Sequence, residues 1–175
     1  MTIRQIIHSY ITSQEQKERK AGRYHASELG DIISGKLKPK DFFKPKKIDE
    51  EGAWNIFFGV VLEEGLRNVF EQQEVKCEFQ AKKEIKIDDF VIVCKADFKF
   101  SDRIIEMKAP LREKNEISSY HIAQAEAYFR AWGLPVYLMY FMRNGYRQFL
   151  YKTNQSYWDF IVKEVKKFDK KLKEL

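Results

Sequence analysis

The sequence predicts an α/β (α+β) fold in which helices flank a mixed central β-sheet. Three observations predict it: residues 54–70 place apolar side chains at helical spacing, residues 77–108 alternate like strands, and residues 116–142 read as a helix followed by a buried strand. The order helix, three strands, helix, strand is typical of a sheet with helices packed on it. With 175 residues, 44% of them apolar, the chain is expected to fold as a single domain spanning residues 1–175.

Residues 1–52 are expected to form a helical segment followed by a basic arm. The first 20 residues are polar and helical in pattern, and Ser27 is expected to cap a short helix that Gly35 ends. The arm, residues 36–47, carries six lysines and two prolines. Its prolines and its charge indicate irregular structure.

Residues 53–152 hold the predicted core. A helix over residues 54–70 comes first, and a strand over residues 90–100 follows, with alternate side chains on opposite faces. A third strand, residues 104–108, is stopped by Pro110. One apolar face is expected for the helix and one for the strand: Trp54, Phe57, Phe58, Val61, Leu62, Leu66, Val69 and Phe70 in the helix, and Phe90, Ile92, Cys94, Ala96, Phe98 and Phe100 in the strand.

The second half of the core begins with a helix over residues 116–132, which Gly133 and Pro135 end. The apolar run over residues 136–142 reads as a buried strand, and residues 146–152 as a further strand. Residues 153–175 form the last segment, an amphipathic helix rich in lysine. The expected core stripe of the first of these helices is Ile122, Ala125, Phe129 and Trp132.

The composition limits the classes of function. The formal net charge of +6 favours a polyanionic partner such as nucleic acid. Cys77 and Cys94 form no CxxC pair, so no zinc motif is expected, and two thiols cannot supply the four that an iron–sulfur cluster usually needs. The sequence shows no signal peptide and no apolar run of about 20 residues, so a soluble, cytoplasmic protein without membrane contact is expected.

Three charged residues of the predicted strands carry chemical information. Glu106 and Lys108 share a face of the third strand, because side chains alternate across a sheet. A two-residue turn at residues 101–102 would, counting outward, place Asp97 opposite Glu106, with Cβ atoms about 5 Å apart. Facing carboxylates repel, and a divalent cation with oxygen ligands relieves the repulsion. The alternative is a solvated strand face with an ordinary Glu–Lys pair.

Four short motifs, in order along residues 53–142, resemble the PD-(D/E)XK nuclease superfamily, in particular its RecB-like and Cas4-like exonuclease branch. Gly59-Val60-Val61-Leu62-Glu63 is similar to the GxxxE element of the first helix. Cys94-Lys95-Ala96-Asp97 resembles the strand that ends in the metal-binding Asp, and Glu106-Met107-Lys108 resembles the ExK motif. Gln124-Ala125-Glu126-Ala127-Tyr128 resembles the QxxxY motif of the RecB-like branch.

The resemblance implies a catalytic metal site. Glu63, Asp97, Glu106 and the backbone carbonyl of Met107 would bind Mg²⁺ or Mn²⁺, hard ions that prefer oxygen ligands. Lys108 would orient or deprotonate the attacking water and stabilise the charged phosphate. A metal ion serves such a reaction as Lewis acid and as activator of bound water.

The resemblance also implies substrate contacts. Gln124 and Tyr128 would line the site and contact the nucleic-acid backbone, and positions four apart share a helix face. The lysines of the arm, among them Lys36, Lys38 and Lys40, could follow a phosphate backbone, or they could form a solvated face. Aromatic residues could stack on the bases of a single strand or belong to the core: Phe42, Phe43 and Trp54.

The sequence departs from the pattern of this branch in three places. Many members carry a His in the first-helix motif, where this chain has Glu63, and Glu64 follows directly as a rival ligand. The four cysteines typical of Cas4 proteins are missing, so no iron–sulfur cluster is expected. The segment around His25 resembles the N-terminal helix of the branch but lacks its cysteine. His25 and His121 are either neighbours of the metal ligands or structural residues.

The expected function is metal-dependent hydrolysis of DNA phosphodiester bonds, by an exonuclease acting on single-stranded or end-containing DNA. Two alternatives remain open: a nucleic-acid-binding module with this fold and no catalysis, and a structure- or sequence-specific endonuclease or junction resolvase. The resemblance implies DNA as a partner, together with recombination, repair or CRISPR-adaptation proteins.

Overall fold

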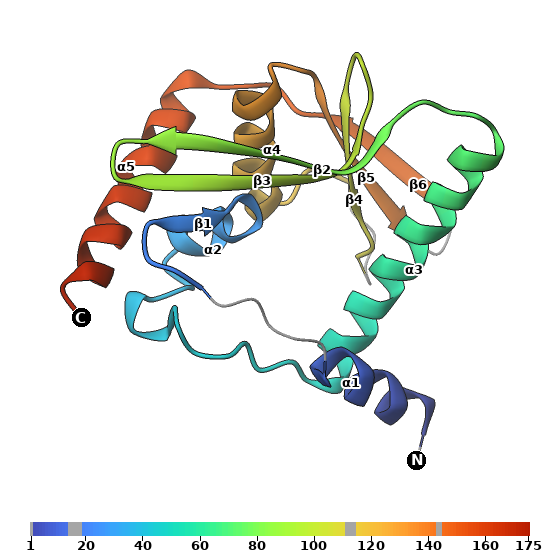
Figure 1. Cartoon of the computed structure of the whole chain (residues 1–175), viewed down its shortest axis with the longest axis horizontal. Coiled ribbons are helices and arrows are strands. Elements are labelled where there is room, and N and C mark those ends of the chain that lie inside the picture. Colours follow the sequence, from blue (N-terminus) through green and yellow to red (C-terminus); the bar gives the residue numbers. More distant parts are fainter. Residues whose placement is uncertain (1, 14–18, 111–114, 143–144) are drawn as a thin grey trace.

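The computed structural model describes residues 2–13, 19–110, 115–142 and 145–175, which fold around one mixed sheet (Figure 1). The helices are α1 (Ile3–Ser13), α2 (Leu29–Ile33), α3 (Glu50–Gln72), α4 (Ser119–Trp132) and α5 (Gln155–Lys173), with two 3-10 turns, η1 (Ala26–Glu28) and η2 (Pro39–Asp41). The strands are β1 (Arg23–His25), β2 (Glu78–Ile87), β3 (Phe90–Lys99), β4 (Ile104–Lys108), β5 (Val136–Met142) and β6 (Gly145–Leu150).

The sheet contains parallel and antiparallel neighbours, as predicted. Its order is β1-β3-β4-β5-β6, and β2 pairs with β3 outside that path. β1 runs parallel to β3 and β4 runs parallel to β5, whereas the other pairs are antiparallel. The sequence does not predict β1, because a run of three residues shows no periodicity and its partner lies far along the chain.

One edge of β3 carries two partners. β2 pairs with β3 over residues 90–99, so β1 and β4 share the opposite edge, at residues 91–93 and 98–99. Residues 94–97 lie in the interval between these two partners. There the Tyr128 hydroxyl of α4 donates a hydrogen bond to the backbone oxygen of Lys95. The sheet therefore opens beside Asp97, the last residue of the interval.

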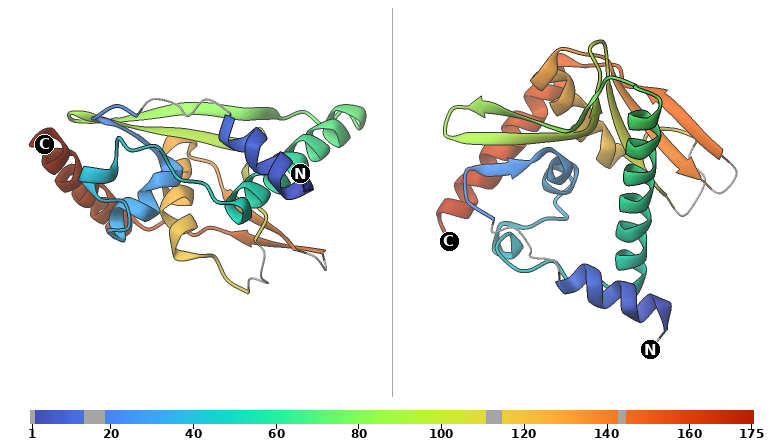
Figure 2. Two further views of the ribbon diagram at one scale, coloured as in Figure 1. Left: turned by 90° about the horizontal axis from the view of Figure 1, so that it is seen from below. Right: turned by 45° about the vertical axis from the view of Figure 1, so that its right-hand side comes forward.

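Two apolar clusters cover the two faces of β4 and β5 (Figure 2). The α4-side cluster includes Ile104, Val136, Leu138 and Tyr140 of the sheet and Ala123, Ala127 and Tyr128 of α4. The α3-side cluster includes Phe98, Phe100, Ile105 and Met107, against which Leu62, Leu66 and Phe70 of α3 pack. Neighbouring residues such as Ile104 and Ile105 lie in different clusters, as alternation in a strand requires.

The apolar residues of β3 do not share one face, so that prediction was wrong. Phe90, Ile92, Cys94 and Ala96 lie in the α4-side cluster, and Phe98 and Phe100 lie in the α3-side cluster. All six occupy even positions, so the strand turns over between Ala96 and Phe98. Strands twist, and β3 turns where it passes from β1 to β4.

The helix predicted over residues 54–70 is present as α3, but its apolar face is only partly covered. The carboxylate of Asp49 caps it by accepting the Gly52 N–H at 2.7 Å. Phe58 and Val61, both predicted to be core residues, are 47% and 48% exposed. No helix of the described residues is long and apolar enough to span a membrane.

The N-terminal segment is less helical than predicted. α1 ends at Ser13, residues 14–18 lie outside the described residues, and residues 19 and 20 are not helical. Ser27 lies within η1 and does not cap a helix, whereas Gly35 follows α2 with a φ of 72°. Gly30 is required by packing, because a Cβ there would lie 2.7 Å from the Tyr120 backbone oxygen of α4.

The basic arm is anchored by a buried ring. Phe42 is fully buried, with its ring centroid 5.5 Å from that of Tyr24 and 5.7 Å from that of Phe168 in α5. A base-stacking role for Phe42 is therefore wrong, since burying its ring between β1 and α5 removes it from solvent. Phe43 is 58% exposed.

The buried face of α4 differs from the predicted stripe. The helix begins at Ser119 rather than at residue 116, and it ends at Gly133, whose φ is 68°. Ile122, Phe129 and Trp132 of the predicted stripe are only half-buried. Ala125 of the stripe is buried as predicted, and the other buried residues are Ala123, Gln124, Glu126, Ala127, Tyr128 and Ala131. Alanines allow α4 to lie close to the sheet, and the row Gln124–Tyr128 thereby reaches the site.

Candidate active site

The β3–β4 hairpin brings Asp97 and Glu106 together. Phe100 N–H donates to the Arg103 carbonyl at 2.8 Å, and Phe98 pairs with Ile105, which is the predicted register. The ladder ends there. In place of the next strand hydrogen bond, the Met107 N–H donates to Asp97 Oδ2 at 2.7 Å. The strands thus separate at the two carboxylates.

Both carboxylates are buried, with exposures of 8% for Asp97 and 4% for Glu106. Burial, together with the charges of Glu106 and Glu63, raises the pKa of Asp97 to about 9, although the bond from Met107 opposes the rise. A buried ionised carboxylate beside a second one is costly unless a cation neutralises the pair. The two carboxyl groups therefore lie close enough, as the sequence predicts, for the charge of Glu106 to disfavour ionisation of Asp97.

A network of hydrogen bonds connects one oxygen of Glu106 to α4. Glu106 Oε1 accepts from Lys108 Nζ at 2.6 Å and from Gln124 Nε2 at 2.7 Å, and Lys108 Nζ also donates to Gln124 Oε1 at 3.0 Å. Gln124 Nε2 in turn donates to the Tyr128 hydroxyl at 2.8 Å. Burial lowers the pKa of Lys108, but the charge and hydrogen bond of Glu106 outweigh it, so the pKa lies above its usual value.

The second oxygen of Glu106 differs from the first. Glu106 Oε2 is the buried side-chain polar atom that lacks a hydrogen-bond partner within the described residues. Such an atom costs free energy unless something outside the chain satisfies it. Carboxylate oxygens are the ligands that Mg²⁺ and Mn²⁺ prefer. The residues present therefore fit a divalent cation beside Asp97 and Glu106.

Glu63 lies near this pair, and a residue of β2 holds one of its oxygens. Its Oε2 accepts a hydrogen bond from Gln80 Nε2 of β2 at 2.9 Å. Burial and the charge of Glu106 raise the pKa of Glu63. Within the described residues, no three His, Cys, Asp or Glu side chains are grouped closely enough to hold a metal ion. Glu64 is exposed and pairs with Arg67 at 3.6 Å, so the geometry favours Glu63 over Glu64 as the residue that serves the site.

Two residues near the site were not identified from the sequence. Gln80 faces Asp97 in the β2–β3 register, which counting back from the turn at residues 88–89 would have shown. Tyr140 lies beside Lys108 in the parallel β4–β5 pair, and its hydroxyl lies 2.6 Å from His121 Nδ1. No sequence pattern connects His121 to Tyr140, since the pair forms only through the fold.

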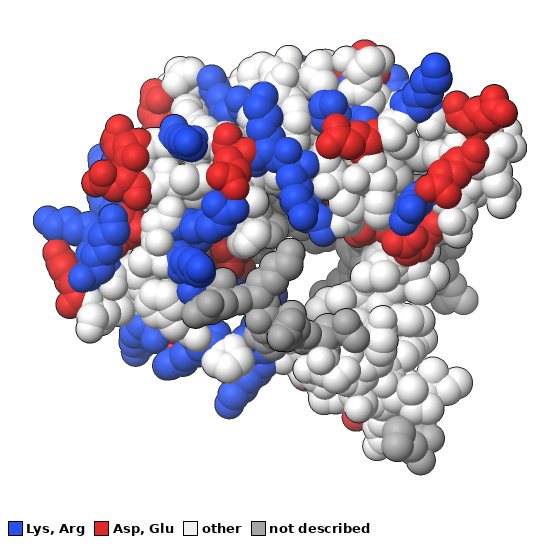
Figure 3. Space-filling view, viewed as in Figure 1, with Lys and Arg blue, Asp and Glu red and all other residues white. Residues whose placement is uncertain are grey.

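The predicted arm lysines Lys36, Lys38 and Lys40 are exposed. Lys36 Nζ lies 4.0 Å from the ring centroid of Tyr120, one helical turn before Gln124, so this lysine lies on the same side of α4 as the site row. Figure 3 shows Lys and Arg interspersed with Asp and Glu over the upper and left parts of this view, with a hollow near its centre. Lys82 and Lys95, which are directly paired between β2 and β3, share one face of the sheet.

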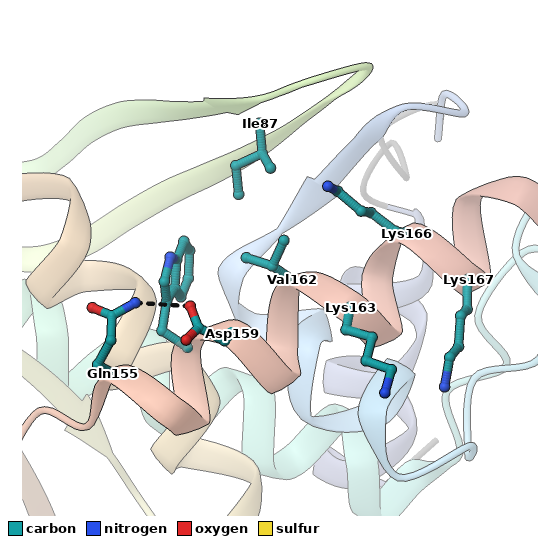
Figure 4. A pocket seen from close by; sticks show the side chains of 8 residues that line it. Ile87, Gln155, Asp159, Val162, Lys163, Lys166 and Lys167 are labelled. Atoms are coloured by element: carbon teal, nitrogen blue, oxygen red, sulfur yellow. Dashed lines mark hydrogen bonds between the residues drawn. The ribbon is translucent and has the colours of Figure 1, made fainter.

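A hollow of about 610 Å³ lies apart from the carboxylates, between α5 and the end of β2 (Figure 4). It is lined by Ile87, Gln155, Trp158, Asp159, Val162, Lys163, Lys166 and Lys167. Lys166 pairs with Asp88 and Lys167 pairs with Glu164 at 2.6 Å. These lysines of α5 are thus partly neutralised, which favours a solvated face over a second nucleic-acid contact.

No protein-family model and no curated protein matches this sequence. Solved structures do match the fold. SSO0001 aligns with a TM-score of 0.71 over 98% of this chain and 87% of its own, at 14% identity. An alkaline exonuclease from Laribacter hongkongensis aligns with a TM-score of 0.60 over 88% of this chain and 89% of its own, also at 14% identity. A phage-related exonuclease from Haemophilus somnus 129PT aligns with a TM-score of 0.61 over 87% and 95%, at 12% identity. The chain therefore shares its fold with proteins that include two exonucleases.

Proposed function

We propose that this protein is a divalent-metal-dependent nuclease that hydrolyses DNA, acting as an exonuclease on single-stranded or end-containing DNA. One observation carries the proposal: the buried pair Asp97–Glu106 leaves Glu106 Oε2 without a partner in the described residues, while the partly buried ammonium of Lys108 bonds to the other oxygen of the same carboxylate. The shared fold with two exonucleases supports it. The order of the four motifs supports the RecB-like branch.

The proposed ligands of Mg²⁺ or Mn²⁺ are Asp97, Glu106, Glu63 and the backbone carbonyl of Met107. When bound, the ion supplies Lewis acidity at a phosphate oxygen and lowers the pKa of coordinated water. Asp97 is held in place for this task by the Met107 N–H. Glu106 is held through its other oxygen, so Oε2 stays available.

Lys108 and α4 supply the remaining chemistry. The ammonium of Lys108 lies within hydrogen-bond reach of Glu106 and Gln124, which fix its position. From there it can hold the attacking water or stabilise charge that builds up on the phosphate. Gln124 and Tyr128 orient Lys108 and Glu106. Both side chains are buried, which favours this positioning role over direct contact with a nucleic-acid backbone.

The surface suits a flexible polyanion. Lys36, Lys38 and Lys40 of the arm, together with Lys82 and Lys95 of the sheet, are exposed and would follow the phosphates of a bound strand. The carboxylates are buried, and a flexible single strand can bend to bring a phosphate to them more easily than a stiff duplex can. We therefore propose that linear single strands are the preferred substrate.

The test compares end-labelled linear single strands, linear duplexes and closed single-stranded circles, each with Mg²⁺, Mn²⁺ or EDTA. We expect rapid loss of linear single strands with either metal, slower loss of duplexes, resistant circles, and no reaction in EDTA. Rapid cutting of circles would replace the exonuclease with an endonuclease. DNA binding without cleavage under all conditions would support the non-catalytic binding module instead.

A further inference from the structure

Gln80 lies in the middle of β2 with a backbone conformation that strands avoid. Its φ is 54°, in the left-handed region, while its neighbours Phe79 and Ala81 keep the regular pairing with β3. Residues with a Cβ are disfavoured in that region. The register is the same on both sides of Gln80, but Gln80 and Asp97 form no pair in the ladder, and β3 turns over at this point.

The two other described non-glycine residues with positive φ have ordinary reasons for it. Glu74 follows the end of α3, and Asp88 lies in the turn between β2 and β3. Left-handed residues are common at both kinds of place. Gln80 alone of the three lies inside a paired strand. Strain of this kind persists where the surrounding structure demands it, often at a functional site.

The side chain of Gln80 shows what its position achieves. Gln80 Nε2 donates to Glu63 Oε2 at 2.9 Å, which connects β2 to α3 across the edge of the site. The bond engages Oε2 of Glu63 and not Oε1. Because Gln80 faces Asp97 in the register, it fixes the Glu63 carboxylate from the strand next to the buried pair.

We propose that Gln80 is a positioning residue of the metal site, whose amide orients Glu63 so that this carboxylate joins Asp97 and Glu106 in binding the cation. The proposal rests on the proposed function. Carboxylate ligands are themselves hydrogen-bonded in metal sites, and loss of such a partner costs about 10–100-fold in metal affinity. The strained φ is then the consequence of aiming the amide at α3.

The test measures Mn²⁺ binding by calorimetry in the absence of DNA, with the full chain. Gln80→Gly removes the amide, and glycine accepts a φ of 54° without strain. We expect Mn²⁺ affinity to fall by about 10-fold or more. The melting temperature of the metal-free variant should stay equal or rise, which a merely structural role for Gln80 would not allow.

Two further variants make the test specific. Gln80→Glu keeps the size of the side chain but sets a carboxylate against Glu63, so its loss of Mn²⁺ affinity should be at least as large. Glu74→Gly also introduces a glycine at a positive φ, 53°, but away from the site. This variant should bind Mn²⁺ as the wild type does.

Glu63→Gln separates this proposal from the proposed function. If Glu63→Gln weakens Mn²⁺ binding and Gln80→Gly does not, the positioning role of Gln80 is overturned and the metal site stands. If the wild type binds no Mn²⁺, the metal site is overturned and the role of Gln80 falls with it. Weakened binding in both variants, with Glu74→Gly unchanged, supports the proposal.

Discussion

Glu106 and Glu126 are both buried glutamates, but the hydrogen bonds to their carboxylate oxygens differ. Glu126 of α4 is fully buried, and both of its oxygens accept hydrogen bonds: from Arg130 at 2.7 Å, from Thr153 at 2.9 Å, from the Asn154 N–H at 3.1 Å and from the Tyr151 hydroxyl. Glu106 has partners on Oε1 only, and its neighbour Asp97 adds a like charge.

The difference is the one expected between a structural carboxylate and a carboxylate that binds a group from outside the chain. Glu126 ties α4 to the segment between β6 and α5, with every lone pair directed at a donor of the same chain. Glu106 leaves an acceptor unsatisfied at a cost that the chain does not offset. Proteins tolerate such a cost where something outside the chain completes the site.

The largest expected effect is on activity at Glu106. Glu106→Gln keeps the volume and removes the charge, so DNA hydrolysis should fall by at least about 100-fold. The melting temperature without metal should stay equal or rise, because the repulsion with Asp97 disappears. Turnover on an end-labelled single strand and thermal melting in EDTA measure the two effects. Normal turnover would remove Glu106 from the site.

Glu126 should show the reverse pattern. Glu126→Gln turns an amide toward donors such as Tyr151 and Asn154, which should lower the free energy of unfolding by about 2–4 kcal/mol. The turnover of the folded fraction should stay within a few-fold of the wild type, since Glu126 lies on the side of α4 away from Gln124. Urea denaturation and active-site titration check these values. Loss of turnover with unchanged stability would contradict the comparison.

The sequence predicts the β3–β4 hairpin and its register well, because local patterns determine them. β4 and β5 match the predicted ranges, and counting from the turn at residues 101–102 places Asp97 beside Glu106. The burial of Phe42 could not be predicted, because its neighbours in the sequence are lysines and the ring is buried by α5, which lies far along the chain. The partners of Glu126 and the Gln80–Glu63 bond arise from contacts between distant segments, which periodicity cannot reveal.

The next prediction concerns Lys108, the hydrogen-bond partner of Glu106 at the candidate site. Lys108→Ala should lower turnover by about 10²–10⁴-fold while DNA affinity changes little, because one ammonium at the carboxylates contributes little to the contacts along a strand. Separate measurement of kcat and of DNA binding in Ca²⁺ distinguishes the two effects. Equal turnover would make Lys108 a simple partner of Glu106.

Asp97→Asn should stabilise the folded protein in the absence of metal. The variant keeps an acceptor for the Met107 N–H, and we expect the free energy of unfolding in EDTA to rise by about 1 kcal/mol or more near neutral pH. Because folding raises the pKa of Asp97, the wild type binds an extra proton when folded and loses stability as pH rises above about 4. Unfolding in EDTA over a range of pH should show that decline in the wild type and a weaker one in the variant.

The smallest effect is expected for Glu64→Gln on α3, with Glu63→Gln as its comparison. Glu64→Gln should be nearly normal in turnover, because Glu64 is exposed, whereas Glu63→Gln should be strongly impaired. Adjacent helix positions point about 100° apart, so one substitution serves as the control for the other. The opposite result would place Glu64 in the site.

The central claim is that the unsatisfied carboxylate pair binds a divalent cation, and metal-induced thermal stabilisation tests it most directly. Mn²⁺ should raise the melting temperature of the wild type through linkage, because the ion binds the folded chain. Glu126→Gln should show the same rise from a lower starting temperature, and Glu106→Gln should show none. An equal rise in Glu106→Gln and the wild type would contradict the account.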